Sequence, residues 1–445
     1  MTTNAKRRRT VLPALIIPAL LSGIAACNGS PTGSGGDPVP VLRQSAVSLA
    51  DNGLEGAAGR TALLDMVGSA TIVGLGEATH GTREFFVLKR QAIQALATRG
   101  FRGVGFEAPW AGTRTIAAYV DGQNISEPQV LNALQYNVWR TAEVMDLLRW
   151  MRAENAKRAP AERLVYFGYD PQDYEYRASG GTMKQIIDLT TSVDASLGAT
   201  IRQQYTALTL ATDTIVSSMR YTDAQRTRLR AILADVRQRM NAAESALVGG
   251  LGAADASWLL RSVVVVEQNW TKAEFDLADE GDKSFNYRDS TMAANARWWQ
   301  QRMGTNTRVA LWAHNGHIGR FTVSGLRSMG LYLSNEVGAQ YWVLGFALGS
   351  GQFNGNAPSD PQRIPAPAPG TVDATLAQVG DKATMFNLRT LTGTADQWSR
   401  TAKGLRWFGA GELRAGPVEL WDIPLQPTFD ALIYVPLTTP SVKMP

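Results

Sequence analysis

Short apolar runs alternate with amphipathic segments along most of the chain. The strand-like runs are "TIVGLG" (71–76), "FRGVGFE" (101–107), "RLVYFGYD" (163–170), "RVALWAH" (308–314) and "YWVLGFAL" (341–348). Between the first two runs, "REFFVLKRQAIQALATRG" has apolar residues at helical spacing and ends at Gly100, which suits a helix C-terminus. This order predicts a βαβ unit. The repeated alternation predicts an α/β fold with a largely parallel sheet flanked by helices.

The segment from about 180 to 300 has a different pattern. "TDAQRTRLRAILADVRQRMNAAESAL" begins with Thr222 and Gln225 at the spacing of a capping box. Its apolar residues then fall on one helical face: Leu229, Ile232, Leu233, Val236, Met240 and Ala243. The run "VVVV" at 263–266 fits either a strand or a buried helix. We expect a helical insertion whose apolar stripe packs against other helices, and a lid is one interpretation of it.

The last part of the chain contains further short apolar runs separated by proline and glycine. They are "ATMFNLR", "VELWDIP" and "ALIYVP". We expect them to extend the sheet or to form its edge.

The N-terminus has the pattern of an export signal. Residues 1–26 combine a basic start, Lys6 to Arg9, with an apolar stretch that is short for a membrane span and contains two prolines. The sequence Ile24-Ala25-Ala26-Cys27 resembles the lipobox of bacterial lipoprotein precursors, which implies lipid attachment at Cys27 and a location in the bacterial cell envelope. The alternative is an incidental cysteine in a plain secretory signal. Residues 27–40 are rich in Gly, Ser and Pro and predict a flexible tether before a domain at 41–445.

Cysteine content and charge exclude several classes of protein. Cys27 is the only cysteine, so a disulfide within the chain and a catalytic thiol in the folded domain are both excluded. Removing the four basic residues of the signal from a total of 44 leaves 40 basic against 39 acidic residues. The basic excess therefore belongs to the signal, and we expect no nucleic-acid partner.

Four strand-like runs end in a carboxylate or an imidazole. Glu77 follows the first run, Glu107 ends the second, Asp170 ends the third and His314 ends the fourth. The carboxyl ends of parallel strands share one edge of a sheet, where α/β proteins bind ligands. As an alternative, carboxylates at strand ends act as helix N-caps or loop anchors, and the "YDPQDY" context of Asp170 fits an ordinary turn.

The other two histidines of the chain lie close to the same positions. His80 comes three residues after Glu77, and the turn dipeptide Asn315-Gly316 could bring His317 back toward the strand ends. A carboxylate beside a histidine fixes the imidazole tautomer, so that the neutral ring can take a proton from water. This arrangement predicts general-base hydrolysis without a covalent intermediate.

Other mechanisms lack their sequence signatures. The chain has no G-x-S-x-G and no G-x-x-x-x-G-K-[ST], and "GLGEAT" fails the dinucleotide pattern because position 79 is threonine. A metal site stays open, since His314 and His317 with His80 and two glutamates could bind Zn²⁺ or Fe²⁺. We expect no cofactor. A metal-dependent hydrolase and a lipoprotein that binds a small ligand without turnover are the alternatives.

Three segments carry a family resemblance. "GEATHGTREFFVLKRQAIQALATRGFRGVGFEAPW" resembles the erythromycin esterase family, and "NYRDSTMAANARWW" and "WAHNGHIG" are similar to later motifs of that family in the same order. The resemblance covers roughly residues 45 to 350. It implies an α/β core with a helical insertion and hydrolysis of a macrocyclic ester by activated water. An ester or lactone is thus the expected substrate, with macrolide inactivation and antibiotic resistance as the expected outcome.

The resemblance also implies roles for particular residues. His80 would be the base that activates water, with Glu77 and Glu107 grouped around it. His314 and His317 would be partners in the active site, and Arg288 would steady the oxyanion, unless it only pairs with Asp289 or another carboxylate. Arg83 and Asp170 are candidates for substrate binding. Lys89 lies in the same stretch, and we expect it on a solvated helix face.

The export signal departs from the family pattern, because resistance esterases of this family act in the cytoplasm. The resemblance therefore supports the catalytic residues more strongly than the identity of the substrate.

Overall fold

The structure is a computed structural model and describes residues 36–50, 53–173, 180–218, 222–278, 280–356, 360–409 and 420–445. The predicted export signal, Cys27 and residues 28–35 lie outside the described residues. Residues Gly35–Pro445 form one compact unit. Helix α1 (Val39–Ser45) begins within the last two residues of the predicted tether. In the described ranges, no helix combines the length and the apolar character needed to cross a bilayer.

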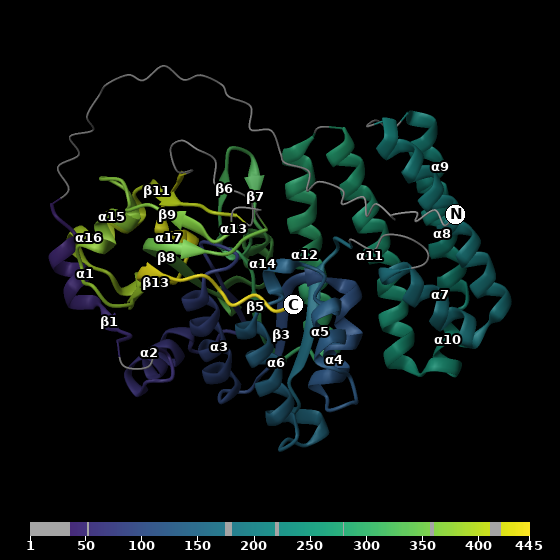
Figure 1. The fold of residues 1–445 in the computed structure, drawn as a ribbon, viewed down its shortest axis with the longest axis horizontal. Coiled ribbons are helices and arrows are strands. Elements are labelled where there is room, and N and C mark those ends of the chain that lie inside the picture. The colour runs from purple at the N-terminus through teal and green to yellow at the C-terminus, as the bar shows by residue number, and fades with distance from the viewer. Residues whose placement is uncertain are drawn as a thin grey trace, which may run out of the picture. The chain divides into compact units, whose positions relative to one another are not determined.

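A central sheet organises this unit (Figure 1). Among the described residues it has nine strands in the order β1-β10-β13-β8-β2-β5-β3-β4, with β9 paired to β8. The strands are β1 (Val47–Ser48), β2 (Ile72–Leu75), β3 (Phe101–Pro109), β4 (Val165–Asp170), β5 (Arg308–Trp312), β8 (Tyr341–Phe353), β9 (Gln362–Ile364), β10 (Thr384–Asn387) and β13 (Ala431–Thr438). The run from β13 to β4 is parallel, whereas β1, β9 and β10 pair antiparallel. The predicted α/β fold with a largely parallel sheet is confirmed, and the five apolar runs correspond to β2, β3, β4, β5 and β8.

The order of the strands reverses next to β2. The chain passes from β2 to β3 and β4 on one side, returns to place β5 between β2 and β3, and then adds β8 and β13 on the other side. In open α/β sheets, ligands bind at such a reversal, beyond the carboxyl ends of the strands. The sequences after β2 and β5 therefore occupy the position in this fold that is best suited to a site.

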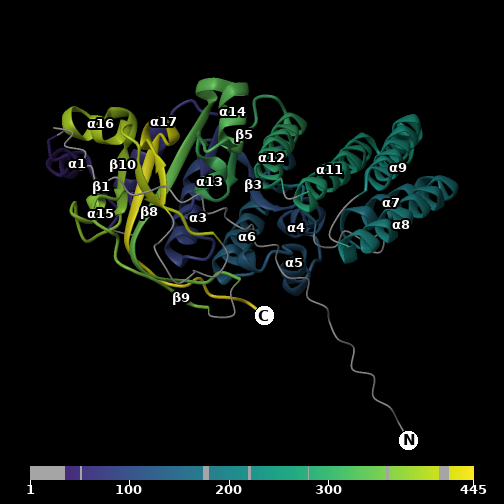
Figure 2. The same cartoon turned by 90° about the horizontal axis from the view of Figure 1, so that it is seen from above.

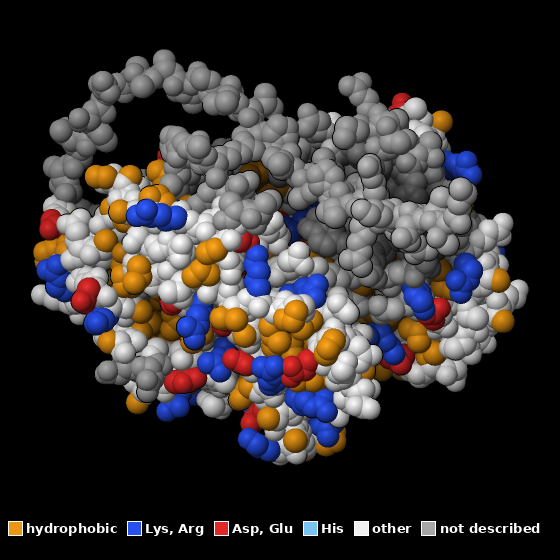
Figure 3. Space-filling view, viewed as in Figure 1, with side chains coloured by type: hydrophobic (Ala, Val, Ile, Leu, Met, Phe, Trp, Pro, Cys, Tyr) orange, Lys and Arg blue, Asp and Glu red, His pale blue; other side chains and the backbone are white. Residues whose placement is uncertain are grey.

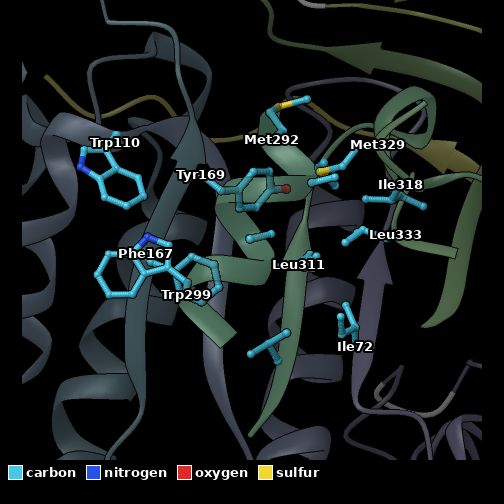
Figure 4. Packing of buried hydrophobic residues seen from close by; sticks show 14 of the residues in the cluster. Ile72, Trp110, Phe167, Tyr169, Met292, Trp299, Leu311, Ile318, Met329 and Leu333 are labelled. Atoms are coloured by element: carbon cyan, nitrogen blue, oxygen red, sulfur yellow. The ribbon is translucent and has the colours of Figure 1, made fainter. Parts of the chain in front are cut away.

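The two faces of the sheet pack into two separate hydrophobic clusters. Val309 and Leu311 belong to one cluster, and Ala310 and Trp312 to the other, as expected for alternating residues of a buried parallel strand. Helices α12 (Gly281–Met303) and α14 (Met329–Val337) cover one face, and α3 (Arg83–Ala97) and α6 (Ala142–Asn155) cover the other (Figure 2). Figure 4 shows the first cluster, in which Trp299 of α12 lies beside Phe167 of β4.

The segment that separates β4 from β5 is helical. It contains α7 (Gly181–Val193), α8 (Ala195–Ser218), α9 (Asp223–Ala242), α10 (Glu244–Leu251) and α11 (Ala253–Leu277), followed by α12. The capping box of Thr222 and Gln225 is present, and the apolar stripe of α9 is buried from Leu229 to Met240. The "VVVV" run lies within α11. In Figure 1, helices α7 to α11 lie to the right of α12, at the end of the sheet away from β1.

The tail of the chain differs in part from the expectation. β10 and β13 join the sheet, but β13 lies inside it, between β8 and β10. "VELWDIP" contributes β12 (Leu420–Ile423), which pairs with β11 (Lys403–Arg406) in a separate two-stranded ribbon. A four-residue apolar pattern does not specify its partner strand. The sequence therefore does not distinguish a strand that joins the main sheet from one that pairs in a separate ribbon.

The remaining elements are short. They are α2 (Ala57–Val67), η1 (Trp110–Gly112), α4 (Thr113–Val120), α5 (Glu127–Ala133), η2 (Asn137–Trp139), η3 (Pro160–Glu162), α13 (Asn315–Ile318), β6 (Thr322–Val323), β7 (Leu326–Arg327), η4 (Gly338–Gln340), α15 (Val372–Ala377), η5 (Leu388–Thr390), α16 (Gly393–Arg400) and α17 (Leu425–Thr428). On the coloured part of the face in Figure 3, Lys and Arg side chains are interspersed with Asp and Glu rather than gathered in a stripe.

Candidate active site

Glu77 and His80 form a hydrogen-bonded pair just beyond β2. Nδ1 of His80 lies 2.6 Å from Oε1 of Glu77. The Glu77 side chain is fully buried, whereas that of His80 is 13% exposed. A proton on Nδ1, donated to the carboxylate, leaves the lone pair on Nε2. In the part of the chain that the structure describes, no group hydrogen-bonds to Nε2, so this nitrogen is the one that can act on a bound molecule.

The loop that carries His80 is held by segments distant in sequence. The carbonyl oxygen of Gly81 accepts hydrogen bonds from the backbone N–H groups of Asn354 (3.0 Å) and Ser441 (2.9 Å). A Cβ at position 81 would lie 1.5 Å from the carbonyl oxygen of Asn354, so only glycine allows this close approach. The loop geometry therefore depends on contacts from the end of β8 and from the C-terminal segment.

Lys89 is buried, and the expectation that it lies on a solvated helix face is wrong. Its side chain is fully buried in α3, with Nζ 2.5 Å from Oε2 of Glu77 and 4.0 Å from the ring centroid of Trp312. Lys89 follows Phe85 and Phe86 by four and three residues, which places it on the buried stripe of the helix. Burial outweighs the attraction of Glu77 and lowers the pKa of Lys89 to about 8.

Glu107, near the end of β3, contacts three site residues. Its Oε1 lies 2.8 Å from Nη2 of Arg288 and 3.3 Å from Nε2 of His317. Its Oε2 accepts the backbone N–H of His314 at 3.0 Å. Burial alone would raise the pKa of Glu107, but the charges of His317 and Arg288 outweigh it and hold the pKa well below its usual range.

Arg288 of α12 pairs with carboxylates from two strands. Its Nε and Nη2 lie 3.2 and 2.5 Å from the two oxygens of Asp170, and Nη2 also donates to Glu107. These contacts use three of the five N–H groups of a guanidinium. Asp170 accepts a further hydrogen bond from the hydroxyl of Tyr136 at 3.0 Å. Arg288 therefore pairs with carboxylates, and the partners are Asp170 and Glu107 rather than Asp289.

His317 lies between two carboxylates. Its Nδ1 is 2.9 Å from both oxygens of Asp289, and its Nε2 faces Glu107 and lies 3.0 Å from Nη1 of Arg288. Burial opposes a charge on the ring, but the attraction of Asp289 and Glu107 prevails and raises the pKa of His317 to about 10. His317 is thus cationic near neutral pH and supplies positive charge rather than a lone pair.

His314 is neutral, and both of its ring nitrogens are hydrogen-bonded to the backbone. Its Nδ1 accepts the backbone N–H of Gly316 at 3.1 Å, and its Nε2 donates to the carbonyl of Phe408 at 2.8 Å. Burial, together with the charges of His80 and His317, lowers the pKa of His314 to about 3. The ring lies 5.0 Å from that of His80, so it borders the site without exchanging protons.

The structure brings most of the candidate residues into one connected set, which comprises Glu77, His80, Glu107, Asp170, Arg288, His314 and His317. Arg83 is outside it, because its side chain is 58% exposed and lies 3.6 Å from Glu143. Three further residues contact this set and were not singled out from the sequence: Tyr136, Trp139 and Phe408. Trp139 donates to the carbonyl of Glu107 at 2.8 Å and meets the His80 ring edge-on at 5.4 Å. No local pattern marks these residues, since Tyr136 and Trp139 come from the short connection between α5 and α6 and Phe408 contacts His314 through its backbone carbonyl.

The same contacts bear on the metal alternative. Among the described residues, no group of three or more His, Cys, Asp or Glu side chains has the arrangement of a metal site. Both nitrogens of His314 are bonded to the backbone, and the buried carboxylates are turned toward Lys89, Arg288 and the imidazoles. A metal ion would have to displace these partners first.

Comparison with known proteins identifies the family. Residues 96–438 match the family described as erythromycin esterase. The chain belongs to the erythromycin esterase family. The predicted resemblance is confirmed, and the chain is accordingly a hydrolase of the erythromycin esterase type.

Related proteins have similar length and low identity. A protein of Bacillus subtilis (strain 168), provisionally named hydrolase YbfO, is 21% identical over 83% of this chain and 84% of its own. The erythromycin esterase type II of Escherichia coli is 22% identical over 65% of this chain and 71% of its own. Among erythromycin esterase-family structures, a mutant of EreC in its open conformation has a TM-score of 0.63 at 16% identity, covering 86% of this chain and 94% of EreC.

A second solved structure supports the same fold. The crystal structure of a Bacillus cereus protein has a TM-score of 0.78 at 23% identity and covers 92% of this chain and 98% of its own. At these identities the likeness establishes the erythromycin esterase-like fold.

Proposed function

We propose that this chain hydrolyses a carboxylic ester or lactone with a water molecule that His80 activates. The observation that supports this most directly is the Glu77–His80 pair, with Nδ1 tied to a buried carboxylate at 2.6 Å and Nε2 open to a bound molecule. A histidine oriented in this way is suited to take a proton from water near neutral pH.

The reaction follows from the positions of the charges. Nε2 of His80 takes a proton from water as the water oxygen bonds to the carbonyl carbon, and the carbonyl electrons move to the oxygen. Glu77 stabilises the imidazolium that forms. The cations Arg288 and His317 stabilise the oxyanion, for which Arg288 keeps N–H groups that bind no carboxylate. The intermediate then collapses, the carbon–oxygen ester bond breaks, and the alkoxide takes the proton from His80.

The other buried charges have supporting roles in this scheme. Lys89 holds one oxygen of Glu77 and leaves the other turned toward His80. Glu107 holds Arg288 and His317 beside each other and fixes the backbone of His314. The His314 ring packs between those of His80 and Trp407. Asp170 acts by anchoring Arg288.

Macrolides are the substrates that we infer for this site. Family membership and the named activity of the Escherichia coli relative support a macrocyclic ester. In this proposal hydrolysis opens the ring by adding one water and inactivates the antibiotic.

The test is turnover by the full chain of erythromycin and a panel of simple esters, followed by mass spectrometry, with and without a chelator. We expect a gain of one water on at least one substrate, unchanged by the chelator. His80→Ala should abolish turnover with an unchanged melting curve, while Arg83→Ala, at the start of α3 and outside the set, should keep it. Activity lost to the chelator and restored by added metal would instead favour the metal-dependent alternative. Ligand retention with no turnover would favour a binding protein.

We also propose that the chain is held in the bacterial envelope by a lipid on Cys27. The basis is the signal-like segment before this cysteine and the Gly/Ser/Pro tether after it. Labelled fatty acid should be incorporated into the wild-type chain and not into Cys27→Ser. Equal labelling of both chains would refute the proposal.

A further inference from the structure

A row of rings leads away from the reactive histidine. The His80 and His314 rings lie 5.0 Å apart, and the indole of Trp407 meets His314 at 4.5 Å. Trp407 in turn stacks on Trp421 at 3.6 Å with an interplanar angle of 2°. Trp407 directly follows β11 and Trp421 lies in β12, so the separate two-stranded ribbon supplies the far end of this row.

The backbone around the site is shaped to receive Trp407. A Cβ at Gly316, between the two site histidines of α13, would lie 1.8 Å from the Trp407 ring. The indole therefore rests on the backbone of the short helix that carries His317. A side chain at position 316 would exclude it.

The residues on each side of Trp407 are anchored firmly. Arg406 is buried and forms an ion pair with buried Asp373 at 3.5 Å, and its backbone N–H donates to the same carboxylate at 3.1 Å. Phe408 donates its N–H to the carbonyl of Ala78 at 3.1 Å and accepts Nε2 of His314 at 2.8 Å. The position of Trp407 is thus fixed relative to both loops of the active site.

Trp407 and Trp421 are also partly exposed, unlike their neighbours. Leu405 and Phe408 are 0% and 2% exposed and pack in the core, whereas both tryptophans keep part of their surface outside it. Ligand sites are mostly apolar with a few charged groups. His80 itself contacts Glu77, the His314 ring and the edge of Trp139, so an apolar surface at Trp407 would extend the aromatic part of the site.

We propose that Trp407, backed by Trp421, is the subsite that receives the apolar ring of the substrate while the ester carbonyl lies at His80. This inference rests on the proposed function and deepens it, since it assigns the part of the protein that distinguishes bulky ring-bearing esters from small ones. A flat indole face gives a ring a large contact area at low conformational cost. The energy of that contact is then available to place the carbonyl against the activated water.

The experiment compares Trp407→Leu, Trp421→Leu and wild type with erythromycin and with 4-nitrophenyl acetate. Trp150→Leu is the matched control, because Trp150 of α6 is also partly buried and packs on a core cluster but lies outside the row of rings. We expect Trp407→Leu to raise the KM for erythromycin about tenfold or more, and Trp421→Leu to raise it less. The kcat/KM for 4-nitrophenyl acetate should stay within about twofold of wild type, as should both values for Trp150→Leu.

Two results would overturn the subsite. One is a parallel loss on both esters in Trp407→Leu, which would mean that the indole only supports the fold of the site. The other is no change on erythromycin. If wild type hydrolyses neither ester, the proposed function fails, and calorimetric titration with erythromycin decides the subsite by itself. The subsite is supported if wild type binds erythromycin and Trp407→Leu binds it about tenfold more weakly. It is contradicted if wild type does not bind erythromycin.

Discussion

Replacing Lys89 by methionine should stabilise the protein and impair it as an enzyme. Lys89 is fully buried, and its ammonium contacts Glu77 and the ring of Trp312. Methionine has a similar length and shape, so the substitution removes the charge without opening a large cavity. The effect on stability therefore reports the free energy of the buried charge itself.

The magnitude follows from the pKa of Lys89. Burial, only partly offset by Glu77, lowers this pKa from 10.5 to about 8. Each pKa unit corresponds to about 1.4 kcal/mol, so at neutral pH the charged ammonium costs the folded state roughly 3 kcal/mol. The buried Glu77 carboxylate loses one of its two partners at the same time and keeps only His80, which opposes this gain. We therefore expect Lys89→Met to raise the free energy of unfolding by about 3 kcal/mol at most.

The sign of this effect depends on pH in a defined way. Because the folded pKa lies below the unfolded one, the cost is fully present below about pH 8. The wild type then gains stability as pH rises from about 8 toward 10.5, while the variant does not. The advantage of the variant should thus be largest at neutral pH and should vanish near pH 10.5.

Activity should change in the opposite direction. With Lys89 removed, Oε2 of Glu77 loses the ammonium that holds it, so the carboxylate is less firmly oriented toward His80. The imidazole is then less well placed to act on water, and kcat/KM near pH 7 should fall by roughly 10- to 100-fold.

The assay is urea unfolding at several pH values together with the pH dependence of kcat/KM. Arg90→Met is the control, because Arg90 is the next residue of α3 and makes only a long, partly exposed contact with Glu55. It should leave both properties nearly unchanged. A variant at Lys89 that loses more than about 2 kcal/mol of stability but keeps wild-type activity would refute this reasoning and make the lysine a structural residue.

Three further outcomes are expected. Asp289→Asn should cost roughly 3–5 kcal/mol of stability at pH 6 by unpairing His317. Because the folded pKa of His317 is raised to about 10, the difference between wild type and variant in urea unfolding should shrink as pH rises through 10. A difference that stays constant with pH would contradict this prediction. Ser441→Pro removes an N–H donor to the carbonyl of Gly81 and should lower kcat about tenfold, with an unchanged KM and melting curve. The control Val442→Ala changes an exposed side chain and should leave kcat unchanged. Equal kcat values in the two variants would contradict this prediction. His314→Asn should lower kcat/KM without moving either limb of the pH profile, since His314 stays neutral, and a shifted limb would show that this ring titrates.

The fold could be predicted from the sequence because its main signals are local. The five long apolar runs became β2, β3, β4, β5 and β8, and the one marked capping box began a helix. Parallel topology then places strand ends at one edge, which is enough to bring Glu77, Glu107 and His314 together. What these arguments do not fix is the partner of a short strand, as "VELWDIP" shows by pairing in the ribbon with β11.

The site could be predicted only in part, for a related reason. Its residues were visible as charges at strand ends, but their protonation depends on neighbours that no local pattern reveals. His314 is neutral because it is buried and lies beside His80, which comes from far along the chain. Lys89 could have been recognised, since it lies at helical spacing from Phe85 and Phe86 on an apolar stripe. Arg83, six residues before Lys89 in the same helix, is 58% exposed and lies outside the set, so sequence proximity alone does not predict membership of the site.

The most direct test of the account is a single turnover of erythromycin in water labelled with heavy oxygen, with the mass of the intact protein followed throughout. Direct attack by water activated at His80 predicts one heavy oxygen in the carboxylate of the product, a protein mass that never changes, and no product from His80→Ala. A transient increase in protein mass by the acyl group, or unlabelled product, or wild-type turnover by His80→Ala would contradict it.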